Sequence, residues 1–172
     1  DSDEGITGYV GSVEDTTERL QSRRAIDDER ERQAAIIQGT GAGTWEWNVQ
    51  TGEMHFNERW AEIVGFTLDE FSTTTIQTWA DLAHPDDITR SSALFQAHFA
   101  GETPYYECES RMRHRGGHWV WVYTRGKVLT HNTEGQPEWM FGTHLDITLR
   151  KVQEDWLRKS EELLNHTGAL AQ

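Results

Sequence analysis

The chain has 172 residues, a formal net charge of −13 and one cysteine, and this length is enough for one domain with extensions. The excess of acid argues against nucleic acid or an anionic membrane as a partner, and no apolar run approaches the ~20 residues of a membrane span. One cysteine excludes an intrachain disulfide and a cysteine-based zinc site, so we expect a cytoplasmic location, whether or not a longer parent protein is membrane-anchored.

A repeat at the length of a domain organises the chain. Residues 5–10 have the composition of a strand end, and the Gly, Asp, Thr and Arg positions of residues 11–19 recur in residues 142–150. Each copy leads into a charged helix that ends near a Thr-Gly-Ala sequence, at residues 40–42 and 167–169. This pattern predicts a tandem array of like units. Its parts are the tail of a preceding unit at residues 1–13, a linker helix at 14–40, a complete domain at 41–148, and a second linker helix at 149–172 that leads to a next domain.

The complete domain opens with a predicted hairpin. Residues 44–49 alternate between apolar and polar side chains, and a turn separates them from a short second strand at residues 54–56. Asn57 then caps a helix over residues 58–64, which Gly65 closes.

Three more helical segments fill the middle of the domain. A short turn follows Thr67, and either Thr75 or Thr78 caps the next one. The longest segment, residues 86–99, has a proline near its first turn and ends before Gly101.

The last third of the domain consists of strands. Residues 119–129 are rich in β-branched and aromatic residues, residues 105–113 alternate between two faces, and residues 139–147 run as a further strand. Turn sequences separate these segments at Gly116-Gly117 and at residues 132–135. Hairpin-like connections imply antiparallel pairing. The order of elements predicts an α+β fold in which the helices cover one face of the sheet.

The strand over residues 119–129 carries apolar side chains on both faces, so both faces should be covered. We expect the face with the two tryptophans to meet a linker helix or a second subunit. Periodicity alone leaves open which face lines the interior of the domain. One face holds Trp119, Trp121 and Tyr123, and the other holds Val120, Val122 and Thr124.

Six short motifs occur in a fixed order: Gly43-x-Trp45-Glu-Trp47, Trp60-x-x-Ile-Val-Gly65-Phe-x-x-x-Glu70-Phe, His84-Pro85-Asp86-Asp87, Gly117-x-x-x-Trp121-Val, Arg125-Gly126 and Gly142-x-x-x-Asp146-Ile-Thr148. With these motifs, residues 41–150 resemble a PAS domain, whose C-terminal portion is often called PAC. The resemblance implies a five-stranded antiparallel sheet, short helices on one face, and a cavity between them. It also implies a non-enzymatic sensory input to a histidine kinase, a diguanylate cyclase or a similar protein, with neighbouring PAS and effector domains as partners.

A cavity of this kind would be lined by side chains that alternation places on one face. The expected ligand is a small metabolite of unknown identity. Two alternatives remain: a ligand-free relay domain with a filled core, and a haem- or flavin-bound redox or gas sensor. The lining candidates are Trp47, Leu94, Ser110, Met112, Val120, Val122, Thr124 and Phe141.

The junction with the last helix is the candidate signal relay. Asp146 and Thr148 offer side-chain oxygens where that helix begins, and Asp146 can also accept a charged hydrogen bond from Arg125. A ligand that moved the strand would then bias the helix, whereas a simple helix cap is the competing interpretation. Both linker helices are too polar to be stable alone, so we expect a homodimer that forms through them.

The histidines and the cysteine are the remaining candidates for chemistry, since no catalytic constellation is present and no metal site is expected. His98 is the candidate axial haem ligand, because some haem-binding PAS domains supply this ligand from the longer helix. Cys108 lies on a predicted strand, outside the Asn-Cys-Arg helical motif of flavin-bonding photoreceptors, and is interpreted as a small core residue. No cofactor is firmly implied.

Overall fold

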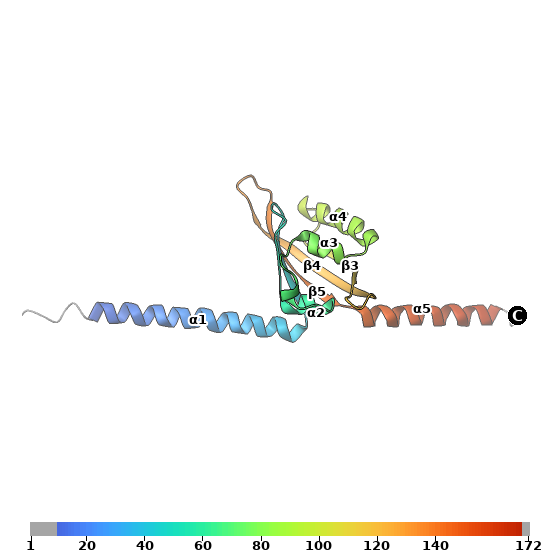
Figure 1. Ribbon diagram of the computed structural model, residues 1–172, viewed down its shortest axis with the longest axis horizontal. Coiled ribbons are helices and arrows are strands. Elements are labelled where there is room, and N and C mark those ends of the chain that lie inside the picture. The colour runs from blue at the N-terminus through green and yellow to red at the C-terminus, as the bar shows by residue number, and fades with distance from the viewer. Residues whose placement is uncertain (1–9, 170–172) are drawn as a thin grey trace, which may run out of the picture. The chain divides into compact units, whose positions relative to one another are not determined.

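The computed structural model describes residues 10–169, and the chain divides after Gly41 into two units (Figure 1). The first unit contains helix α1, Val10–Thr40, whose described side chains are exposed. Val10, expected in a strand end, is therefore helical, and the linker helix begins four residues before the predicted position 14. The rest of the predicted strand end, residues 5–9, lies outside the described residues.

The second unit is a five-stranded antiparallel sheet with strand order β2-β1-β5-β4-β3 and helices α2 to α4 on one face, as predicted (Figure 1). None of the helices within residues 10–169 combines the length and apolar character that a bilayer crossing requires. The strands are β1 Gly43–Asn48, β2 Met54–Phe56, β3 Tyr106–Arg113, β4 Trp119–His131 and β5 Pro137–Asp146. The helices are α2 Glu58–Ile63, the 3-10 helix η1 Leu68–Glu70, α3 Ile76–Leu82, α4 Pro85–Phe99 and α5 Thr148–Ala169.

Polar caps fix where the helices begin. The Asn57 side chain accepts hydrogen bonds from the backbone N–H of Trp60 at 3.0 Å and of Thr44 at 2.8 Å, so it caps α2 and ties that helix to β1. Thr75, not Thr78, is the N-cap of α3. His84 Nδ1 accepts the N–H of Asp86 at the start of α4, at 3.2 Å.

Burial shows which face of β4 lines the interior of the domain. Val120, Val122 and Thr124 are buried beneath the helices, together with the inward residues of β3. Trp119, Trp121 and Tyr123 lie on the outer face, where they remain partly exposed. The inner face is therefore the core, and the outer tryptophan face is available to the last helix.

Two glycines allow a tryptophan to lie flat on the inner face. Gly126 of β4 and Gly142 of β5 are directly paired, and a Cβ on either residue would come within 2.7 Å of the Trp45 ring. The Trp45 indole thus occupies the space that two side chains would otherwise fill, and it is 3% exposed. This contact explains why glycine is required in the Arg125-Gly126 motif and at the start of the Gly142 motif.

Candidate functional site

The end of the sheet continues directly into helix α5. The Trp121 backbone N–H donates to Thr148 Oγ1 at 3.0 Å, and its carbonyl accepts from the Ile147 N–H at 2.8 Å. Asp146 Oδ1 accepts the Thr148 N–H at 2.9 Å. Both backbone groups of Trp121, near the start of β4, are therefore bonded to the first residue of α5 and to the residue before it, so a displacement of β4 would be transmitted to the helix.

Glu109 forms a second link between the sheet and α5. Its side chain lies on the outer face of β3 and accepts hydrogen bonds from Arg150 at 2.5 Å and from Lys151, both in the first turn of α5. The bonds from Lys151 and then Arg150 hold the pKa of Glu109 below its ordinary value. The Lys151 ammonium also lies 5.1 Å from the centroid of the Trp121 ring.

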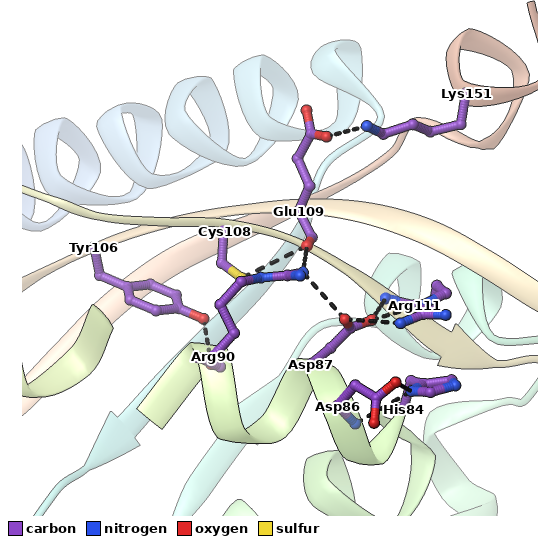
Figure 2. A network of polar contacts seen from close by, with 10 residues as sticks. His84, Asp86, Asp87, Arg90, Tyr106, Cys108, Glu109, Arg111 and Lys151 are labelled. Atoms are coloured by element: carbon purple, nitrogen blue, oxygen red, sulfur yellow. Dashed lines mark hydrogen bonds and ion pairs between the residues drawn. The ribbon is translucent and has the colours of Figure 1, made fainter. Parts of the chain in front are cut away.

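A buried carboxylate joins the same strand to α4. Asp87 is fully buried and accepts from the Arg111 backbone N–H at 2.8 Å and from the Arg111 side chain at 2.9 and 3.0 Å. Arg90 lies 3.1 Å from Asp87 and also donates to the Glu109 carbonyl. Figure 2 shows this continuous network, which runs from α4 through the edge strand β3 to Lys151. Glu109 contacts α4 through its backbone and α5 through its side chain.

The predicted relay residues separate into two groups. Asp146 and Thr148 lie at the junction, but the expected bond between Arg125 and Asp146 is wrong. Arg125 instead pairs with Glu107 at 3.0 Å, because the register of β4 and β5 places Arg125 opposite Thr143. The sequence analysis did not identify Glu109 or its partners Arg150 and Lys151 as part of this site. The usable signal was an acidic side chain on the outer face of β3 together with two adjacent cations at the start of α5.

The inner face encloses a cavity of about 20 Å³, which is room for about one water molecule. Of the predicted lining residues, Trp47 and Thr124 border it. Leu94 packs against the core, and four others are buried on the inner face without bordering the cavity. Those four are Ser110, Met112, Val120 and Val122. The cavity is lined by Trp45, Trp47, Met54, Ile76, Trp79, Phe95, Tyr106, Thr124 and His144.

Phe141 requires a correction, because it lies on the outer face of β5. Its neighbour Met140 is the fully buried residue, and Gly142 and His144 follow on the inner face at alternate positions. A phenylalanine gives a stronger apolar signal than the glycine that actually faces the core. His144, which the sequence did not single out, is buried, and burial lowers its pKa to about 3, so the ring is neutral at ordinary pH.

Both ring nitrogens of His98 are occupied. Nδ1 lies 2.9 Å from the Thr103 carbonyl oxygen, and Nε2 accepts the Val128 N–H at 3.1 Å. His98 therefore joins α4 to β4 and has no free nitrogen for haem iron. Cys108 is buried on β3, with its Sγ 3.6 Å from the Glu109 carbonyl. Within the described side chains, no group of three or more histidine, cysteine or acidic residues could hold a metal.

The comparisons with known proteins agree with this fold. A family model described as the PAS fold matches residues 53–144. The chain belongs to the PAS family. The crystal structure of a sensory box histidine kinase/response regulator from Burkholderia thailandensis is 35% identical to this PAS chain. Its TM-score is 0.68, and the match covers 78% of this chain and 98% of that one.

The curated relatives that this chain matches are much longer than the chain, which spans 30% or less of their length in the two cases given below. A blue-light-activated histidine kinase from Brucella ovis is 29% identical over an alignment of 159 positions, and the match covers 85% of this chain and 30% of that protein. A probable diguanylate cyclase from Escherichia coli is 21% identical, and the match covers 92% of this chain and 14% of that protein. The N-terminal domain of a diguanylate cyclase with a PAS/PAC sensor from Marinobacter aquaeolei is 25% identical, with a TM-score of 0.55. The chain is thus a PAS sensor module of the kind found in signalling proteins.

Proposed function

We propose that this PAS module relays a conformational signal from its core to helix α5, and that α5 controls an output domain of a longer cytoplasmic protein. The observation that carries the proposal is the double attachment of α5 to the sheet, through the Trp121 backbone and through Glu109. A movement of β3 or β4 would change both attachments together. The relatives support a histidine kinase or a diguanylate cyclase as the output, and we assign catalysis to that domain and not to this chain.

Helix α5 is proposed to pair with α5 of a second copy. Leu149, Val152 and Trp156 follow the spacing of one helix face and are 59–72% exposed, which is unfavourable for a helix that stays alone. A groove of about 410 Å³ that Trp121, Val152 and Trp156 line, together with Lys151, Asp155 and Lys159, gives the second helix a place to pack. In a homodimer, a change at Glu109 would alter how the two helices pack, which is a two-state coupling.

A large cofactor does not fit the interior. A haem or a flavin would have to enter a cavity of about 20 Å³, and His98 already uses both of its nitrogens within the fold. We therefore propose a relay that works without either group, and the cavity leaves room only for a very small ligand.

The relay is tested by joining residues 1–172 in helical register to the catalytic domain of a histidine kinase and measuring autophosphorylation. Glu109→Gln removes the charge that holds Arg150 and Lys151, so we expect the rate to change severalfold. Glu107→Gln is the matched control, since Glu107 lies on the same face of β3 but pairs with Arg125 and Tyr123 instead of α5. Equal rates for Glu109→Gln and the unmodified fusion would refute the relay.

A further inference from the structure

The outer face of the sheet carries apolar side chains along β5, the central strand, which has two strands on each side. Helices α2 to α4 cover the opposite face (Figure 1). Phe141, Trp139 and Leu145 of β5 are partly exposed on the outer face. The Trp139 ring lies 6.3 Å from that of Phe141 and 6.0 Å from that of His55 on β2, measured between centroids. A connected apolar patch of this kind is typical of a protein–protein contact.

Two charged residues flank Phe141 in the same row of the sheet. Lys127 of β4 is directly opposite Phe141 on one side, and Glu46 of β1 is directly opposite it on the other. Both side chains are exposed, and within residues 10–169 neither forms an ion pair. The row therefore carries a base, an aromatic ring and an acid, with the ring on the central strand.

A two-fold axis along β5 matches these charges between two copies of the chain. In a two-fold dimer the same patch of both subunits forms the interface. Rotation about an axis that runs along β5 between two facing sheets places β4 of each copy over β1 of the other. Lys127 then meets Glu46 of the partner subunit, twice in the dimer, and Phe141 meets its own copy. An axis across the strands would instead place like charges together, which is unfavourable.

The same axis is compatible with the proposed pairing of α5. Rotation about the strand direction leaves both copies pointing the same way, so both α5 helices leave their sheets at the same end. Leu149, Val152 and Trp156, which are exposed, can then pair between parallel helices. Facing sheets pack about 10 Å apart and paired helices about 8–10 Å apart, so one axis accommodates both contacts.

We propose that the outer face of the sheet is an interface with a second copy of this chain, centred on Phe141 and oriented by reciprocal contacts between Lys127 and Glu46. This inference rests on the proposed α5 homodimer and extends it from the helix to the sheet. Strand β4, whose Trp121 is bonded to the start of α5, is then held against β1 of the other copy. A displacement of β4 would thus reach both subunits.

The test measures the dimer dissociation constant of the full 172-residue chain by sedimentation equilibrium. Lys127→Glu and Glu46→Lys should each raise it about tenfold, because both reciprocal contacts become repulsive. The double variant should return to within about threefold of the parent, since the reversed charges attract again. Overall charge predicts the opposite for Glu46→Lys, which reduces the excess of acid. Glu102→Lys makes the same charge change on the exposed loop after α4 and should not weaken the dimer.

Crosslinking locates the interface. Phe141→Cys, made in a Cys108→Ser chain, places two thiols across the axis, so a short bismaleimide should join the two copies. Glu102→Cys in the same chain carries an exposed thiol away from the outer face and should not be joined.

A dimer that ignores the charge reversals and is not joined through position 141 would overturn the sheet interface and leave the α5 pairing as its basis. A monomer whose thiol at position 141 resists maleimide would mean that another part of the chain covers this face, which overturns the proposal. A monomer with a reactive thiol there overturns it as well. The kinase-fusion test depends on Glu109 alone, so the relay is judged separately.

Discussion

Strand β3 has an acidic contact on each side, and the two contacts differ in burial. Asp87 on the α4 side is fully buried and makes three hydrogen bonds to Arg111, two of them from a guanidinium in bidentate geometry. Glu109 on the α5 side is 33% exposed, and its partners Arg150 and Lys151 are 50% and 25% exposed. The first contact has replaced water with fixed donors, whereas the second still competes with water.

This difference assigns a separate task to each side of the strand. A buried ion pair is expensive to break, so the α4 contact fixes the edge of the sheet. A partly exposed ion pair contributes ~0–1 kcal/mol and exchanges readily, so the α5 contact can open without unfolding the core. The strand between them thus connects a rigid layer to a helix that can be released, which is what a relay requires.

The largest effect is expected from Asp87→Asn, which leaves Arg111 without its charged partner. We expect a loss of about 3 kcal/mol in the free energy of unfolding, measured with urea at pH 7. Asp86→Asn, in the same turn with an 81% exposed side chain, should cost under ~0.5 kcal/mol. A similar small loss for both variants would show that the α4 contact is no stronger than a surface pair.

Burial alone would raise the pKa of Asp87, but the hydrogen bonds from Arg111 outweigh it and hold that pKa below its ordinary value. The stability that this carboxylate contributes is therefore present above pH ~4 and is lost as pH falls through its lower folded value. Asp87→Asn should weaken the dependence on pH in that acid range only.

His144 gives a second large effect, on the inner face. Because burial lowers its pKa from 6.5 to about 3, the unfolded chain binds a proton between these values that the folded chain does not. Stability should fall by about 2 kcal/mol between pH 7 and pH 5 from this group. Urea unfolding of His144→Gln should lack that part of the decrease, and a parallel pH profile for variant and parent would contradict the assignment.

The sequence was sufficient for elements whose signals are local. The five strands of the domain and the Asn57 cap follow from short patterns and lie within two residues of the predicted positions, whereas the strand end expected at Val10 is helical. Contacts between distant residues were harder. Asp87 was predicted only as a residue at the start of the longest helix, because its partner Arg111 is 24 residues away and a pattern along one segment carries no information on that pairing.

The sequence also could not show which face of β4 and β5 points toward the core. The alternation of β4 is apolar on both sides because the outer side meets the start of α5, so periodicity could not choose between the faces. On β5 a glycine faces the core and a phenylalanine faces outward, which reverses the usual signal. Only the Trp45 ring, which belongs to β1, explains that arrangement.

A smaller effect is expected at the junction itself. Thr148→Val keeps the shape of the side chain but removes the acceptor for the Trp121 N–H, which should cost about 1 kcal/mol in urea unfolding. Thr143→Val, on β5 away from the junction, is the matched control. If both variants lose the same stability, the loss comes from the substitution type and not from the junction.

The smallest change in global stability is expected from Glu109→Gln, at about 0.5 kcal/mol, because water already competes for this contact. Its local effect should be clearer. Amide hydrogen exchange in the first turn of α5 should accelerate two- to fivefold, the factor that corresponds to roughly 0.5–1 kcal/mol of lost local protection. Glu107→Gln should leave the exchange rates in that turn unchanged.

Raising the salt concentration should reproduce the effect of Glu109→Gln on the exchange rates. The contact of buried Asp87 should stay intact, because solvent ions screen exposed charges and barely reach buried ones. Unchanged exchange in α5 after both treatments would mean that the Trp121 backbone alone holds the helix, and the two sides of β3 would then not differ in the way their burial indicates.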